Sequence, residues 1–275
     1  MKASFACRSA ELRWGLAGLA AIAAVGVVGP WLVPWSVDRA TADVLVAPST
    51  AHWLGTDDEG VDVAAKVAAG AQLALLVGLG YAGLSVSLGT AIGMAAGYFG
   101  GRVDAVVRWA CDTLLCFPGL LLALLIGFVA DRPGLGTLIV ALAATGWAGH
   151  ARLARALADS ARRRDFVVAA RCLGASHWRV LTVHVLPELA GPMLVQGTLA
   201  VATGVLAEAS LSFLGLGPQG LASWGAMLEQ GAAVVLQAPW VLAAAGGALL
   251  VLVSAVNLIG DGLRDLLDPR VGSPR

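Results

Sequence analysis

Two carboxyl groups, Asp112 and Glu208, lie beside long stretches of the sequence that contain almost no other charge. Burying an ionised side chain at membrane depth is costly, so such a group is a candidate either for a transport pathway or for a structural hydrogen bond. Ser210 and Ser212 follow Glu208 closely, and small residues of this kind allow helices to pack tightly. We expect a pathway or packing role for four residues: Asp112, Glu208, Ser210 and Ser212. Packing is favoured around Glu208, and an ion pair with Arg108 is favoured for Asp112.

Histidine and cysteine, the usual ligands of transition metals, are few and scattered. His150, His177 and His184 fall in one polar stretch, whereas His52 precedes an acidic segment that could contact cations. None of the four cysteines forms a C-x-x-C pair, so the sequence predicts neither a disulfide framework nor a cysteine metal site. We assign no metal ligand and no catalytic residue.

The chain also lacks the Gly-x-x-x-x-Gly-Lys-Ser/Thr motif whose backbone amides hold nucleotide phosphates. No set of nucleophile, base and orienting group stands out either. We therefore predict that the protein is not an enzyme and that it binds no cofactor, so that any ATP must be bound elsewhere.

The polar stretch from His150 to Pro187 is the most informative segment. Its apolar residues recur at helical spacing, Gly174 interrupts them, and Ser176 is a suitable N-cap for a second short helix. Helix, glycine turn and helix would form a knob with alanines at its tip, small enough to enter a groove of another protein. An alternative is a basic loop that contacts anionic lipid headgroups.

The amino-acid composition indicates the kind of protein in which these polar residues lie. Hydrophobic residues make up 58% of the 275-residue chain and charged residues only 13%, about half the ~25% of a soluble domain. That is too little charge for a solvated surface, so we predict an integral membrane protein. The formal net charge of zero removes the general electrostatic argument for nucleic-acid binding.

Long charge-free runs of about 20 residues predict membrane-spanning helices, and they lack the alternation of barrel strands. The fold class is all-α, with about six spans and a lead-in helix before the second. The expected spans are Trp14–Leu32, Leu73–Ala96, Thr113–Ala130, Leu135–Ala151, Ala190–Phe213 and Trp240–Asn257.

Basic residues give the orientation, because cytoplasmic loops carry an excess of Lys and Arg. Fifteen of the 18 fall on the side of both termini, seven of them in the polar stretch, whereas the segment after the first span is acidic. We expect a multi-pass protein of a bacterial inner (cytoplasmic) membrane with both termini in the cytoplasm.

Several motifs resemble the permease subunits of ABC importers, in particular the C-type subunits of dipeptide, oligopeptide and nickel systems. The polar stretch is similar to their EAA loop through Val168, Ala169, Ala170 and Gly174, followed by Leu186 and Pro187. Further matches, in one order and register, include Leu54-Gly55-Thr56-Asp57, Gly97-Tyr98-Phe99-Gly100-Gly101, Gly174-Ala175-Ser176, the run Glu208 to Gly217, Trp224-Gly225, and Asn257 to Arg270. Two positions depart from the family pattern: Val168 replaces a usual Glu, and Val61 a usual Arg.

The resemblance implies a type I ABC importer (MetI-like) transmembrane domain. It divides the chain into residues 1–35, a tail and first anchor; 36–71, an extracytoplasmic segment with the lead-in helix; 72–262, the core permease domain; and 263–275, a cytoplasmic tail. The coupling loop would span about 152–187. Its implied contact residues are Asp165, Val168, Ala169, Ala170, Gly174, Ala175, Ser176, Leu186 and Pro187.

The resemblance also implies partners. These are a second homologous permease subunit, two cytoplasmic ATPase subunits that bind ATP and Mg²⁺, an extracytoplasmic substrate-binding protein, and membrane lipid. The expected function is to form half of a peptide pathway and to couple ATP hydrolysis to alternating access. A nickel or metal-chelate importer is an alternative within the family. A stand-alone secondary transporter is an alternative of another class, which mid-span charge relays and an internal repeat would favour.

Overall fold

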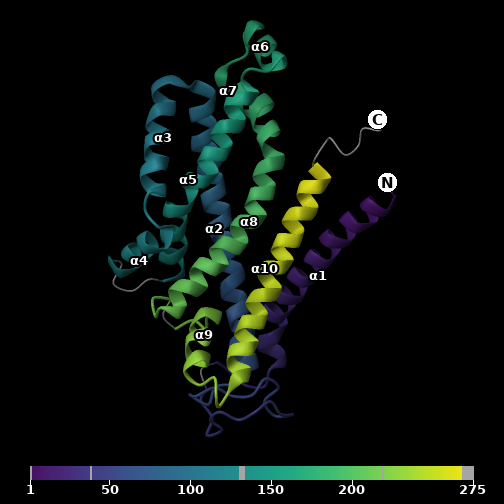
Figure 1. Cartoon of the computed structure of the whole chain (residues 1–275), viewed down its shortest axis with the longest axis vertical. Helices are drawn as coiled ribbons and strands as arrows, with labels where there is room; N and C mark the ends of the chain where they lie inside the picture. Colours follow the sequence, from purple (N-terminus) through teal and green to yellow (C-terminus); the bar gives the residue numbers. More distant parts are fainter. Residues whose placement is uncertain (1, 38, 130–133, 219, 268–275) are drawn as a thin grey trace.

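The computed structural model describes residues 2–37, 39–129, 134–218 and 220–267, and the elements in this part of the chain are helices (Figure 1). They form an elongated bundle in which no strand occurs among the described residues, and a single β-bridge joins Thr56 and Asp62. In order, the elements are α1 (Lys2–Leu32), α2 (Val63–Phe99), α3 (Gly101–Leu115), α4 (Gly119–Val129), α5 (Leu135–Ala161), α6 (Asp165–Cys172), α7 (His177–Arg179), the π-helical turn η1 (Val180–Val185), α8 (Leu186–Phe213), α9 (Trp224–Ala233) and α10 (Pro239–Leu267).

The longest helix, α2, forms the centre of the bundle and packs against α5, α8 and α1. Gly89, Gly93 and Gly97 lie on the face towards α5, where an added Cβ would overlap with the backbone of that helix. Small residues at this spacing let two helix backbones approach closely. The prediction of a separate lead-in helix is therefore wrong: α2 runs unbroken for 37 residues, about 55 Å, because its glycines serve packing rather than interruption.

Among the described residues, four helical segments are long and apolar enough to cross a membrane: Ala10–Leu32, Val63–Phe99, His177–Phe213 and Pro239–Leu267. A fifth is obtained if α3 and the first part of α4 count as one span, although these two helices meet at 85°. The expected total of six is not confirmed. The expected span that is missing from this set is Leu135–Ala151, which falls in the first part of α5. The second half of α5 carries Arg152 and Arg155 and extends to Ala161.

The break between α3 and α4 falls inside the span that we expected at Thr113–Ala130, whose last residue lies outside the described part of the chain. The chain leaves the helix after Leu115 and re-enters it at Gly119. Pro118 has no amide hydrogen, and its ring disfavours helical geometry at the preceding Phe117, which explains the bend. The sequence contained this signal, and a straight helix was the wrong interpretation.

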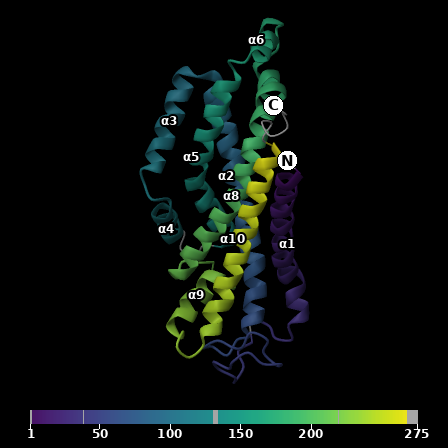
Figure 2. The same cartoon turned by 45° about the vertical axis from the view of Figure 1, so that its right-hand side comes forward.

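The first and last helices lie side by side (Figure 2). Gly15 and Gly18 of α1 contact Ala255 and Ile259 of α10, so that neither glycine position has room for a side chain. The start of α1 and the end of α10 lie towards the end of the molecule that carries α6 (Figures 1 and 2). Both helix ends thus fall on one side of the bundle, as the distribution of basic residues requires.

The opposite end of the bundle is closed by residues 33–37 and 39–62 and by α9 (Figure 1). Trp224 at the start of α9 is fully buried, and its indole nitrogen donates to the carbonyl oxygen of Val67 at 3.0 Å. Trp240 at the start of α10 donates in the same way to the carbonyl oxygen of Thr56 at 3.1 Å. Two tryptophans therefore attach the irregular segment and α9 to the helical bundle.

Candidate functional site

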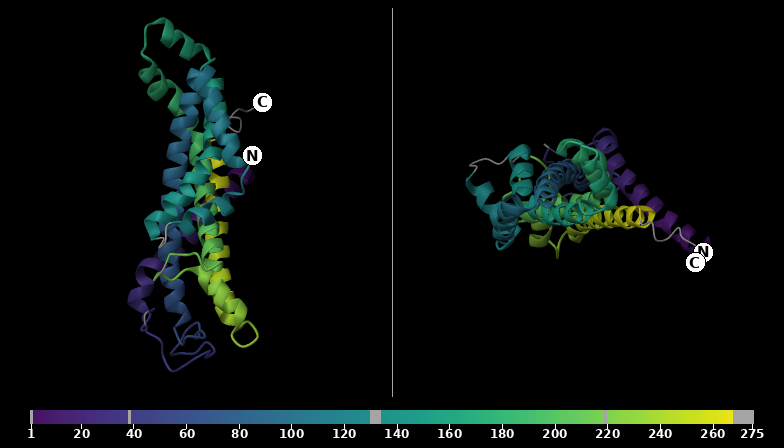
Figure 3. Two further views of the ribbon diagram at one scale, coloured as in Figure 1. Left: turned by 90° about the vertical axis from the view of Figure 1, so that its left-hand side faces the viewer. Right: turned by 90° about the horizontal axis from the view of Figure 1, so that it is seen from above.

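The segment between α5 and α8 projects beyond the ends of the other helices (Figure 3). Its helix α6 ends at Cys172, and Gly174 follows with φ +83, a conformation that glycine adopts without steric cost. Ser176 caps the next helix, because its hydroxyl accepts a hydrogen bond from the amide of Arg179 at 3.3 Å. The predicted order of elements, a helix, a glycine turn and a capped helix, is confirmed.

Large apolar side chains, and not only alanines, cover the tip of this projection. Leu173 is 88% exposed and Trp178 is 75% exposed, and Val168 is also exposed. Ala169 is exposed and Ala170 is half-buried, as the predicted alanine tip requires. Sequence reasoning missed Leu173 and Trp178, although both stand within four residues of Gly174 in an otherwise polar stretch. Exposed apolar groups of this size are typical of a surface that a partner covers.

The base of the projection is packed as tightly as a protein core. Val167 of α6 and Val180 and Val185 of η1 have no exposed surface, and they pack in one cluster with Ala154 and Ala158 of α5. Close-packed side chains transmit displacement instead of absorbing it. This packing joins α6 to α5 and to the helical turn η1.

The other expected contact residues surround the tip. Asp165 begins α6, where a carboxylate interacts favourably with the helix dipole. Ala175 is half-buried, and Ser176, Leu186 and Pro187 are exposed. An ion pair between Arg164 Nη1 and Glu188 Oε2, at 2.6 Å, also ties the start of α6 to the start of α8.

We had expected the short helix after Ser176 to be separate from the following span. The structure shows that the short helix is continuous with that span. It continues through η1 into α8, so that His177–Phe213 is one helical segment. Pro187 does not end the helix, because it occupies the first turn of α8 after a π-helical turn. Such a turn widens the helix locally and relieves the missing amide of proline.

Near the far end of α8, Glu208 is 2% exposed and accepts two hydrogen bonds on the same oxygen. The donors are the hydroxyl of Ser212 at 2.6 Å, one turn along α8, and the hydroxyl of Ser223 at 2.7 Å, just before α9. Ser223 also accepts from the amide of Gly225 at 3.0 Å. This network joins α8 to α9, whereas Ser210 is exposed and bonds only within its own helix. The geometry fits the packing role that we favoured for Glu208 and Ser212.

Asp112 does not form the expected ion pair. The guanidinium of Arg108 lies 3.0 Å from Asp104, one turn earlier on α3, and Arg155 of α5 pairs with the same carboxylate. Asp112 is exposed on α3. In the sequence, Asp104 and Asp112 each lie four positions from Arg108, so either could pair with it. Arg155 of α5 also pairs with Asp104, and this long-range contact could not be read from the sequence.

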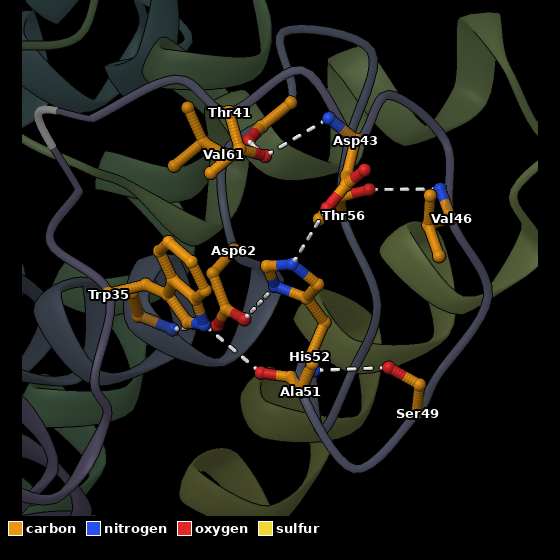
Figure 4. A network of polar contacts seen from close by, with 12 residues as sticks. Trp35, Thr41, Asp43, Val46, Ser49, Ala51, His52, Thr56, Val61 and Asp62 are labelled. Atoms are coloured by element: carbon orange, nitrogen blue, oxygen red, sulfur yellow. Dashed lines mark hydrogen bonds and ion pairs between the residues drawn. The ribbon is translucent and has the colours of Figure 1, made fainter.

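The irregular segment at the opposite end holds a buried polar network (Figure 4). Asp62 caps α2 by accepting from the amide of Ala65 at 3.0 Å, and its other oxygen lies 2.9 Å from His52 Nδ1. The imidazole stacks on Trp35 and lies 3.7 Å from Asp43. These groups satisfy one another, which favours a structural role for His52 over the cation contact that we had considered.

Lys66 of α2 pairs with two of the carboxylates at this end of the molecule, and no local sequence pattern indicated these partners. Its ammonium group pairs with the fully buried Asp57 and with Glu59, and it donates to Gln230 of α9 at 3.2 Å. Val61, one of the two departures from the family pattern, is buried beside this cluster, and its amide donates to Asp57 at 2.8 Å. The structure thus uses the backbone of this position, while its side chain packs inside.

These features define a helical membrane protein: a bundle of apolar helices with a projecting loop at one end and a polar cap at the other. Residues 89–273 match the family model of binding-protein-dependent transport system inner membrane components. The chain belongs to this family.

Individual relatives agree with the family match. A putative peptide transport system permease protein of Brucella suis biovar 1 (strain 1330) is 40% identical over 266 residues, covering 96% of this chain and 89% of the relative. The dipeptide transport system permease protein DppC of Bacillus subtilis (strain 168) is 39% identical over 250 residues, covering 90% and 78%. The probable D,D-dipeptide transport system permease protein DdpC of Escherichia coli (strain K12) is 37% identical over 250 residues, covering 90% and 83%.

Proposed function

We propose that this protein is the permease subunit of an ABC importer that carries di- or oligopeptides, and that it forms half of the translocation pathway. The peptide cargo is supported by the relatives, which are named for peptide and dipeptide transport. One structural observation carries the coupling role: the projecting loop exposes Leu173 and Trp178 at its tip on a fully buried base. A tip of this kind gains stability only when a partner covers it.

The proposed partners are those of the family arrangement. A second permease subunit completes the pathway, two ATPase subunits bind ATP and Mg²⁺ and dock on the loop, and a substrate-binding protein delivers cargo at the opposite end. The loop end is cytoplasmic in this proposal, because its arginines follow the distribution of basic residues on cytoplasmic surfaces. Both termini then lie in the cytoplasm, and the polar cap of residues 33–37 and 39–62 faces outward.

In the proposed mechanism, ATP binding closes the ATPase pair and displaces the docked loop. The displacement passes through Val167 and Val180 to α5 and α8, because these side chains are fully buried between the helices. At the far end of α8, the bonds of Glu208 carry α9 along. The protein would alternate between outward-open and inward-open states whose populations follow ATP and the binding protein.

The coupling role is tested by replacing Gly174 with valine. A β-branched residue is a severe outlier at φ +83, whereas no neighbouring atom lies near enough to clash, so the strain would act on the turn alone. Gly136→Val is the matched control, because Gly136 lies at the opposite end of α5 and also has open space. We expect Gly174→Val to insert in the membrane but to lose ATPase association and peptide uptake.

Normal uptake by Gly174→Val would refute the coupling role. Loss of both functions in the Gly136→Val control as well would show that the assay reports general damage. Transport by the purified chain alone, in vesicles without ATP, would instead indicate a secondary transporter and overturn the importer proposal.

A further inference from the structure

A hollow of about 430 Å³ lies beneath the loop, between the end of α2 and the start of α7. It is open on one side, and it is lined by two aromatic and four basic side chains: Tyr98, Phe99, Arg162, Arg163, Arg171 and His177. These residues come from α2, the turn after α5, α6 and α7, so the folded chain brings them together from four segments. No acidic residue contributes to the lining.

The charges around this hollow are unbalanced. Asp159 accepts ion pairs from Arg162 at 2.6 Å and from Arg163 at 2.9 Å, so one carboxylate faces two guanidinium groups. Within the described part of the chain, no ion pair reaches Arg171. Two positive charges therefore remain without a compensating carboxylate, which makes the hollow attractive to an anion.

The lining is also held in place. Arg162 is only partly exposed, its Nη1 donates to the carbonyl oxygen of Tyr98 at 3.3 Å, and it lies so close to Gly100 that a side chain there would collide with it. The hydroxyl of Tyr98 lies 3.0 Å from His177 Nδ1, and this contact leaves Nε2 as the ring nitrogen available to a ligand. The ring of Phe99 packs against the same imidazole.

We propose that this hollow is a binding site for a phosphate group. Guanidinium groups bind phosphate through paired, charge-assisted hydrogen bonds, and Arg162, Arg163 and Arg171 supply three of them around one open space. The aromatic rings of Tyr98 and Phe99 stand where α2 ends, and half of the Phe99 surface is exposed. Tyrosine at the end of a membrane helix is typical of the depth at which lipid headgroups lie. The phosphate can therefore come from an anionic lipid headgroup or from a soluble anion.

The test compares two arginines of the same segment. Arg171→Gln removes a lining charge that no ion pair uses, and Arg179→Gln removes one positive charge from α7 outside the hollow. Each full-length variant is purified in detergent, and native mass spectrometry measures retained phosphatidylglycerol against phosphatidylcholine. A second arm titrates inorganic pyrophosphate and follows the unfolding temperature.

We expect Arg171→Gln to weaken phosphatidylglycerol or pyrophosphate binding about fivefold, and Arg179→Gln to leave it unchanged. An effect in the first arm alone identifies a lipid headgroup, and an effect in the second alone identifies a soluble phosphate. Equal binding by both variants, or no binding in either arm, would overturn the proposal. It would also be overturned if Arg171→Gln reduced only ATPase association, because the charge would then serve a protein partner.

Discussion

Leu173 offers the sharpest test of the proposed docking surface, because a side chain that is almost fully exposed adds little to the stability of the fold. Truncation to alanine removes three carbon atoms, each worth about 0.8 kcal/mol when buried, from a side chain that is 88% exposed. If the ATPase covers this surface, the variant should lose about 2 kcal/mol of association free energy. That loss corresponds to roughly a 30-fold higher Kd.

The assay titrates the partner ATPase subunit against the permease in nanodiscs and records binding by interferometry. Leu236→Ala is the matched control: this leucine is 96% exposed and precedes α10 at the opposite end of the molecule. Neither variant should change thermal stability measurably, because surface substitutions away from packed features have small effects. The reasoning is refuted if Leu173→Ala binds within twofold of the natural protein, or if Leu236→Ala weakens binding equally.

Three further substitutions test the internal contacts. Glu208→Leu should lower stability by about 2 kcal/mol in thermal unfolding, because two buried hydroxyls lose their acceptor, whereas Ser210→Ala should have little effect; equal losses would contradict the network. Gly93→Val should abolish the accumulation of folded protein, as measured by size-exclusion fluorescence, because there is no room for a side chain against α5. Gly83→Val should be tolerated, because open space surrounds that position. Folded Gly93→Val would contradict the close packing of α2 and α5. Lys66→Met should lower the free energy of unfolding by about 3–5 kcal/mol in chemical denaturation, because it leaves the fully buried Asp57 without its cation. A loss smaller than about 1 kcal/mol would argue against that burial.

Local rules explain which parts of the loop could be predicted from the sequence. A glycine that adopts a positive φ and a serine that caps a helix act within a few residues, so Gly174 and Ser176 were recognisable before the fold was known. The bond from Ser212 to Glu208 also spans only one turn. By contrast, the second bond to Glu208 comes from Ser223, which follows a loop whose path the sequence does not define.

The remaining features depend on distant partners. The glycines of α2 could equally have interrupted a helix, and only the position of α5 makes them packing residues. Lys66 donates a hydrogen bond to Gln230, which lies 164 positions later in the sequence, and no local pattern indicates this contact. The exposure of Leu173 and Trp178 is likewise a property of the assembled loop and not of composition. Sequence reasoning therefore located the loop but did not identify its most exposed apolar side chains.

The two contacts of α1 have a consequence for biosynthesis. Its C-terminal half meets α2 through Gly26 and Gly29, which lie against Gln72 and Ala68, soon after both helices have been synthesised. Its N-terminal half meets α10 through Gly15. That partner is made roughly 240 residues later, which takes tens of seconds at about 5–20 residues per second. During this interval lipid must solvate the surface that α10 will cover. The first helix to enter the membrane is therefore among the last to complete its packing.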